Sequence, residues 1–112
     1  DIVMENKKTR IRELNDELRQ HLIGGLAVMT PGVAALGGYA VARIVKTISV
    51  FDDFSRANDP YDEHDFGYFE SEGHVIMFKI DYFDRALKAH SPDPSGSELT
   101  GRVMTIMLAQ EY

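Results

Sequence analysis

The chain has 112 residues, a formal net charge of −6 and no cysteine. This length suits one domain, so we expect a single domain over residues 1–112. The absence of cysteine excludes disulfides, thiolate nucleophiles and cysteine-based zinc or iron–sulfur sites. An acidic chain does not bind nucleic acid by neutralising phosphates, so we expect no direct nucleic-acid binding.

Residues 21–42 form the longest stretch without a charged residue, but glycine and proline interrupt it repeatedly. Such a stretch does not meet the requirements of a membrane span. Residues 1–12 are rich in charge and lack the apolar core of a signal peptide. We therefore expect a cytoplasmic protein that does not associate with a membrane.

The first half of the chain predicts two helices with a short strand between them. Apolar residues at three- and four-residue spacing predict a helix over residues 7–23, ended by a pair of glycines. Residues 26–29 are apolar and bounded by breakers, which predicts a buried strand. Residues 30–36 are typical of a turn or a short helix. A second helix is expected over residues 39–48.

The middle of the chain predicts strands. Aromatic and β-branched residues over residues 49–54 predict one strand. The clearest pattern is a β-hairpin of residues 66–69 and 74–83, joined by a turn at residues 70–73. Alternate residues of its second arm are expected to face the core, namely His74, Ile76, Phe78, Ile80 and Tyr82.

The last part of the chain predicts helix again. Residues 85–90 suggest one or two helical turns, and residues 91–97 a loop. Apolar residues at a 3.6-residue period then predict a helix that starts near residue 93 or 97 and ends near residue 110. Together the elements predict an α+β fold, with an antiparallel sheet of three to four strands and two to three helices packed mainly on one face.

The negative charge is concentrated in residues 52–72, which carry −7 and leave the rest of the chain close to neutral. The acidic residues of this segment are Asp52, Asp53, Asp59, Asp62, Glu63, Asp65, Glu70 and Glu72. A local field of this sign attracts cations, either metal ions or the basic surface of a partner. Our leading interpretation is a non-enzymatic interaction module that docks a basic protein surface, such as that of a nucleic-acid-binding effector, through these residues. The alternative without a function is a solvated, hydrogen-bonded loop.

A metal-dependent hydrolase or nuclease is the alternative function, centred on the Glu-His-Asp stretch at residues 63–65 and the Lys-Ile-Asp stretch at residues 79–81. Divalent metals prefer oxygen ligands, and the candidate ligands are Asp59, Glu63 and Asp65. The candidate catalytic residues are His64, Lys79 and Asp81. No cofactor other than a divalent metal ion is expected.

Two features weigh against this catalytic centre. In an extended strand Glu63 and Asp65 share one face while His64 points away, so the three residues could not hold one ion. The order of Lys79 and Asp81 reverses the acid-x-lysine pattern of restriction-type nucleases. An ion pair on the sheet is the simpler interpretation of these two residues.

Different short motifs are spread along nearly the whole chain. They are LNDELR at 14–19, TPGV at 30–33, FDDF at 51–54, NDPYDEHDFG at 58–67, KIDY at 79–82, SPDP at 91–94 and RVMTIMLAQEY at 102–112. In these motifs the chain resembles a family of small bacterial proteins of unknown function, often carried on plasmids and other mobile elements. Asp62 stands where that family usually has glycine, which argues against a tight turn, and Gly101 stands where a basic residue is usual. The resemblance implies no established activity, but its mobile-element setting implies a role against host defence, of the antirestriction or anti-CRISPR kind.

Overall fold

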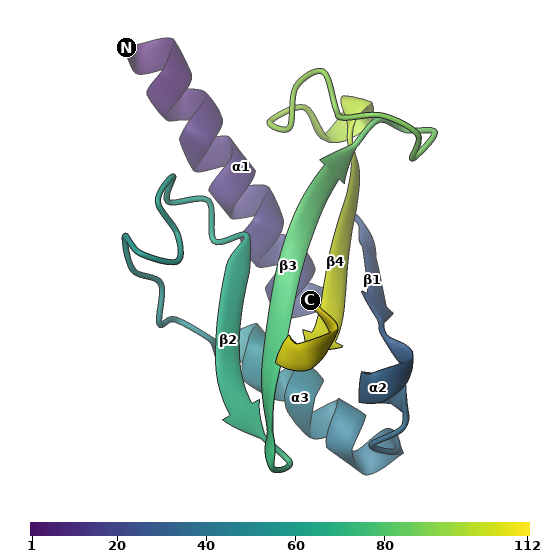
Figure 1. Cartoon of the computed structure of the whole chain (residues 1–112). Coiled ribbons are helices and arrows are strands. Elements are labelled where there is room, and N and C mark those ends of the chain that lie inside the picture. The colour runs from purple at the N-terminus through teal and green to yellow at the C-terminus, as the bar shows by residue number, and fades with distance from the viewer.

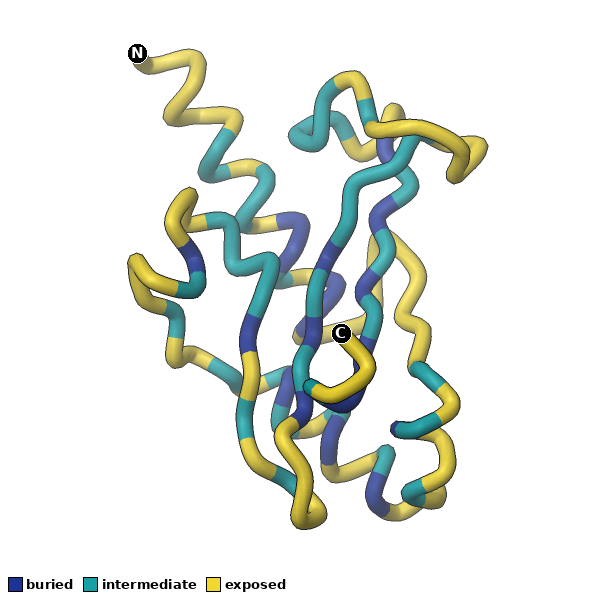
Figure 2. Tube along the Cα trace, viewed as in Figure 1, coloured by how far each residue is buried: buried dark blue, intermediate teal, exposed yellow.

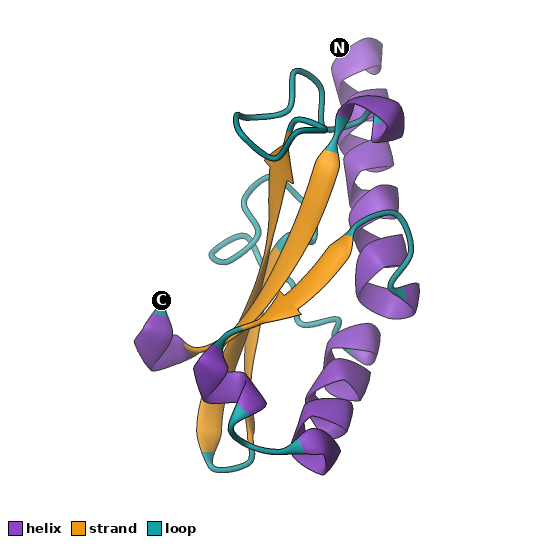
Figure 3. Ribbon diagram, turned by 90° about the vertical axis from the view of Figure 1, so that its right-hand side faces the viewer, coloured by secondary structure: helices purple, strands orange, loops and turns teal.

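The computed structural model describes all residues from 1 to 112 as an α+β fold built on a four-stranded mixed sheet. The strands lie in the order β1–β4–β3–β2. They are β1 (Leu26–Met29), β2 (Phe66–Ser71), β3 (His74–Phe83) and β4 (Gly101–Leu108). Two helices, α1 (Ile2–His21) and α3 (Gly38–Val50), lie on one face of the sheet (Figures 1 and 3). The predicted α+β class with helices mainly on one face is confirmed.

α1 starts earlier than predicted and ends close to the predicted glycine pair. Its predicted apolar face is confirmed at Leu14 and Leu18, which are both buried. Two polar side chains, Asn15 and Arg19, are buried beside them. The spacing of apolar residues did not predict this, because polar residues on an amphipathic helix normally face solvent.

Residues 26–29 form a strand as predicted, but all four residues of β1 are exposed, so the prediction of a buried strand is wrong. β1 is an edge strand with β4 on one side and no strand on the other. The short helix proposed next to it is confirmed as α2 (Pro31–Ala34), whose first turn is capped by the Thr30 hydroxyl accepting from the Val33 N–H at 3.4 Å.

The predicted second helix is confirmed as α3, but the strand predicted over residues 49–54 is wrong. α3 continues through Val50, and residues 51–65 form an irregular connection to β2. The aromatic residues that suggested a strand pack against the core instead. The ring of Phe51 meets the ring of Phe78 edge-on at 5.3 Å and that of Phe54 at 5.0 Å.

The predicted hairpin is confirmed as the antiparallel pair β2–β3. Glu72 and Gly73 form its turn, with φ of 59° and 76°. The expected core face is buried at Ile76, Phe78 and Ile80. Of the other residues expected on that face, Tyr82 is partly buried, whereas His74 is exposed at the hairpin end.

The predicted last helix is wrong, because residues 101–108 form the central strand β4. β4 is antiparallel to β3 and parallel to β1, which also corrects the expectation of a wholly antiparallel sheet. Apolar residues occur on both faces of β4, so its period of two is hidden in a nearly continuous apolar run. The helical turns predicted over residues 85–90 are absent, and that segment forms turns and bends.

The core lies between the helices and the sheet (Figure 2). Its buried members are Leu18, Val33, Ile44, Ile48, Ile76, Phe78, Ile80, Met104, Ile106 and Leu108. None of the helices combines the length and the apolar composition that crossing a bilayer requires. The connection of residues 51–65 runs from the end of α3 past α1 and so places the acidic segment against that helix (Figure 1).

Candidate functional site

The buried carboxylate of Asp59 forms hydrogen bonds within residues 51–65, which we call the acidic connection. It accepts the backbone N–H groups of Glu63 at 2.9 Å and of His64 at 3.2 Å. Asp62 and His64 both adopt φ of 56°, the left-handed region that favours glycine, and the Asp62 N–H donates to the Asp59 carbonyl at 3.1 Å. Asp62 therefore lies in a tight turn, although the family pattern argued against one there, and His64 does not have the extended geometry that we considered for residues 63–65.

The imidazole of His64 is held on two sides. Its Nδ1 lies 2.9 Å from the carboxylate of Asp16 on α1, and its ring stacks on Phe54 at 3.9 Å with an interplanar angle of 6°. A carboxylate can only accept, so Nδ1 carries the proton in this pair. The ring orientation is thus defined by a residue that lies 48 positions earlier in the chain.

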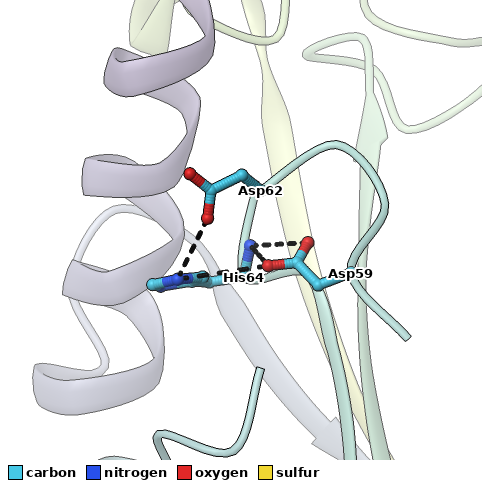
Figure 4. A group of neighbouring side chains, drawn as sticks. All are labelled: Asp59, Asp62 and His64. Atoms are coloured by element: carbon cyan, nitrogen blue, oxygen red, sulfur yellow. Dashed lines mark hydrogen bonds and ion pairs between the residues drawn. The ribbon is translucent and has the colours of Figure 1, made fainter. Parts of the chain in front are cut away.

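The other ring nitrogen of His64 faces two carboxylates. Its Nε2 lies 3.6 Å from Asp62 and 4.0 Å from Asp59, and Figure 4 shows the three side chains converging. With Nδ1 protonated, a neutral imidazole presents a lone pair at Nε2 toward these oxygens. Three electron-pair donors then surround one point, which is an arrangement that suits a metal ion.

Arg19 holds Asp16 in its position beside His64. It is buried and donates to Asp16 at 2.9 Å and to the carbonyls of Ile48 and Phe51, both at 2.8 Å. The two carbonyls lie at the C-terminal end of α3, where the Ile48 carbonyl also accepts the Phe51 N–H at 3.2 Å. Arg19 therefore joins α1, α3 and Asp16 into one rigid unit. Asp16 and Arg19 were not among the predicted site residues, although both lie in the LNDELR motif.

A second polar network, which includes Asn15 of α1, holds Glu63 in place next to His64. Asn15 donates to the Glu63 carbonyl at 2.9 Å and to the Tyr82 hydroxyl at 2.7 Å, and it accepts from Arg102 at 2.8 Å. The Tyr82 hydroxyl donates to the Glu63 carboxylate at 2.7 Å. Burial, followed by the Glu63 hydrogen bond, raises the pKa of Tyr82, and burial lowers the pKa of Arg102. Arg102 also donates to the carbonyl of Pro94.

An open pocket of about 380 Å³ adjoins His64. Its polar wall includes Asp16, Asp52 and Asp62, and its apolar wall includes Phe51 and Phe54. The pocket gives a small molecule access to the carboxylate and imidazole groups.

The other predicted catalytic residues lie elsewhere. Lys79 and Asp81 form an ion pair at 3.1 Å and line a separate pocket of about 490 Å³ together with Asp65. Burial and neighbouring carboxylates raise the pKa of Asp65 to about 6. His64 lines the first pocket and not the second, so of the Glu-His-Asp stretch only Asp65 lies beside Lys79 and Asp81.

Of the three predicted metal ligands, only Asp59 belongs to the group of possible ligands around His64. The potential ligand atoms of Asp59, Asp62 and His64 all lie within 4.8 Å of one another. Glu63 is engaged by Tyr82, and Asp65 faces the other pocket. We refer to Asp59, Asp62 and His64 as the histidine–carboxylate cluster.

Half of the eight acidic residues proposed for partner docking bind other groups within the chain. Asp62 pairs with Arg12 at 2.6 Å, and Glu72 pairs with Arg43 at 2.7 Å. The Arg43 hydrogen bond lowers the pKa of Glu72. The acidic residues that are exposed without an ion pair are Asp52, Asp53 and Glu70.

Comparison with known proteins gives a family and no function. Residues 29–111 match the family DUF3768, which is described as a protein of unknown function. No curated protein and no solved structure matched the chain. The match includes the histidine–carboxylate cluster and the whole sheet except the first residues of β1, while α1 lies outside it. Since the matched region covers most of the sequence, the chain belongs to the DUF3768 family of proteins of unknown function.

Proposed function

We propose that the chain binds a divalent transition-metal ion at the histidine–carboxylate cluster and uses it in a hydrolytic reaction. The observation that carries the proposal is His64 Nε2, which faces the carboxylates of Asp62 and Asp59 at 3.6 and 4.0 Å. One imidazole and two carboxylates are a donor set suited to zinc, manganese or iron. This donor set supports the proposed metal site.

The environment of His64 supports a metal ligand. Histidines that bind metals usually donate their second N–H to a carboxylate, which orients the ring and increases its basicity. Asp16 occupies that position at 2.9 Å from Nδ1. Asp59 is fixed by two backbone N–H groups, so its carboxylate does not need to reorganise on metal binding. Asp62 is held by Arg12, which the ion would displace or share.

The number of protein ligands supports chemistry at the ion. Three protein ligands leave at least one coordination position for water, and catalytic sites differ from closed structural sites in this respect. Asp59, Asp62 and His64 would hold the ion, and such an ion would supply a nucleophile for hydrolysis by lowering the pKa of a bound water. The adjoining pocket of about 380 Å³ provides room for a small ester or phosphoester.

Isothermal titration with Mn²⁺ and Zn²⁺ tests metal binding. His64→Ala and Asp62→Asn should abolish or strongly weaken binding, and Asp16→Asn should weaken it roughly 10–100-fold because it only orients the ligand. Asp53→Asn is the matched control, since Asp53 is exposed in the same connection without an ion pair. No binding at millimolar metal, or unchanged binding by His64→Ala, would refute the site.

Hydrolysis needs a separate measurement. Chromogenic carboxylic and phosphate esters should be cleaved by the metal-loaded protein and not after chelation, and His64→Ala should remove the activity. Metal binding without cleavage of either ester class would refute the hydrolytic part of the proposal and leave a metal-binding domain.

A second candidate function is docking to a basic protein surface, such as that of an effector of host defence. The observation that favours it is the pair Asp52 and Asp53, which are exposed without ion-pair partners beside the pocket. Asp52→Lys with Asp53→Lys should abolish binding of a labelled oligolysine peptide, and Glu72→Lys should have a smaller effect because Glu72 is already neutralised by Arg43. Equal effects of the two changes would count against docking at this place.

A further inference from the structure

A further pocket of about 380 Å³ lies at the end of the sheet where β3 ends and β4 begins, which is the upper end in Figure 1. Its walls come from residues 24–26 around the start of β1, from the connection between β3 and β4, and from the first residues of β4. It shares no lining residue with the pocket beside the histidine–carboxylate cluster. A role for this pocket is therefore independent of the proposed metal site.

The charge of this pocket is opposite to that of the chain. Its lining includes two arginines, Arg85 and Arg102, and no acidic residue, although the chain carries a net charge of −6. The acidic residues that adjoin the lining in sequence, Asp84 and Glu98, form no ion pair with either arginine. A pocket with this local charge attracts an anion.

These two arginines lack the partners that most arginines of the chain have. Four of the seven arginines form ion pairs with carboxylates, namely Arg10, Arg12, Arg19 and Arg43. Of the three that do not, Arg85 and Arg102 line this one pocket, and Arg56 is exposed outside it. The positive charge that the chain leaves unpaired is thus concentrated here.

Arg102 shows most clearly that an anion is missing. It is 1% exposed and donates only to neutral groups, the Asn15 side chain and the Pro94 carbonyl, while its Nη1 has no partner within the chain. A buried charge without an opposite charge beside it is costly, and burial accordingly lowers the pKa of Arg102. The other buried arginine, Arg19, has such a partner in Asp16 at 2.9 Å. An anion in the pocket would provide for Arg102 what Asp16 provides for Arg19.

Backbone and hydroxyl donors lie in the same pocket. The N–H groups of Gly24 and Gly25 donate to no other group of the chain. Gly25 lies so close to β4 that an added Cβ would overlap the Arg102 carbonyl oxygen, so glycine is required for this approach. The Ser97 hydroxyl has only a 3.5 Å contact with Glu98. Guanidinium, amide and hydroxyl groups are the donors that proteins use to bind phosphate oxygens.

We propose that this pocket binds the phosphate group of a small molecule. A phosphate monoester carries a charge of roughly −1.5 to −2 at pH 7, which matches two guanidinium groups better than the single charge of a carboxylate does. Leu26 and Leu87 line the same pocket and offer apolar contacts to the rest of the molecule. The volume lies within the range of roughly 300–1,000 Å³ that is usual for small-molecule sites.

Titration calorimetry and amide NMR spectra of the metal-free protein test this site, with inorganic phosphate, phenyl phosphate and benzoate as probes at constant ionic strength. Phenyl phosphate should bind more tightly than inorganic phosphate, because its ring contacts the leucines. It should also bind more tightly than benzoate, which has the same ring and only one charge. The amide signals of Gly24 and Gly25 should shift during the titration and then saturate.

Matched variants separate this pocket from a general effect of charge. Arg85→Gln should weaken phenyl phosphate binding at least about tenfold, because it removes a charged hydrogen-bond donor from an exposed position. Arg56→Gln removes the same charge from an exposed arginine outside the pocket and should leave the affinity unchanged. Arg102→Lys keeps the charge without the planar fork and should weaken binding, with circular dichroism reporting that the fold is retained.

Three results would overturn the proposal. One is the absence of binding by both phosphate probes at tens of millimolar. Another is binding of benzoate that is as tight as that of phenyl phosphate. The third is an equal loss of affinity in Arg85→Gln and Arg56→Gln, since the phosphate would then not be held in this pocket.

Discussion

Asn15→Leu should destabilise the fold by about 3 kcal/mol, because Asn15 joins α1 to the acidic connection and to the sheet. The leucine side chain has the same branching and the same number of heavy atoms as asparagine, so the main effect of the change is the loss of hydrogen bonds. Asn15 donates to Glu63 and Tyr82 and accepts from the buried Arg102.

The magnitude follows from the three bonds. The two neutral ones contribute roughly 0.5–1.5 kcal/mol each, and the one from the charged Arg102 contributes roughly 1.5–3 kcal/mol. Burial of the leucine side chain offsets the loss by roughly 1–2 kcal/mol. The remaining loss is a large part of a total stability on the order of 5–15 kcal/mol.

Urea unfolding followed by circular dichroism measures the loss, with the slope of the transition checked for constancy. Asn6→Leu is the matched control, because Asn6 is exposed on the same helix. Tyr82→Phe, alone and combined with Asn15→Leu, completes a double-mutant cycle that should show a coupling energy of at least about 0.5 kcal/mol. A midpoint for Asn15→Leu equal to that of the control, or strict additivity in the cycle, would refute the proposed network.

Three further changes test other parts of the structure. Gly67→Ala should lower the stability by about 1–3 kcal/mol in urea unfolding, because an added Cβ would lie 2.6 Å from the Phe78 ring. Glu72→Gln should lower the melting temperature at low salt and not at high salt, since its ion pair with Arg43 is exposed and screened. The pKa of Asp65 is raised from 3.8 to about 6, so the folded state binds this proton more tightly and its stability falls as the pH rises through this window. Asp65→Asn should therefore be more stable than wild type at pH 7 and not below pH 4, in thermal melts with a chelator present.

The sequence predicted the hairpin well for a physical reason. In β3 the buried residues Ile76, Phe78 and Ile80 alternate with Lys79 and Asp81, so the period of two is visible in the residue types. A strand with one apolar and one polar face can be recognised from its own sequence.

The central strand β4 was predicted as a helix for the opposite reason. Arg102, Met104 and Ile106 face the helix layer, whereas Val103 and Thr105 face the open side. Because neither face is charged except at Arg102, the alternation disappears, and a run of this length also satisfies a helical period. Only its pairing with β1 and β3, which depends on distant residues, distinguishes the two.

The sequence predicted where the candidate site lies but not all of the residues that form it. The sequence drew attention to residues 58–67 through their density of carboxylates, and two members of the cluster, Asp59 and His64, were considered for metal binding or catalysis. Assigning strand geometry to Glu63 and Asp65 separated His64 from its neighbours. In the structure Asp62 and His64 have a left-handed backbone conformation, which brings His64 back to its neighbours. The spacing of residue types in a sequence does not predict this conformation.

The burial of polar residues on α1 explains why the site exists where it does. Polar residues on an amphipathic helix ordinarily face solvent, yet Asn15, Asp16 and Arg19 are at least partly buried. Asn15 and Arg19 donate hydrogen bonds to segments more than 28 residues away. Asp16 orients His64, which lies 48 residues away. A buried polar group is costly unless its partners are complete, so the connection can take only the path that supplies them. That path brings Asp62 and His64 together beside Asp59. The polar face of one helix thus determines both the course of the acidic connection and the geometry of the histidine–carboxylate cluster.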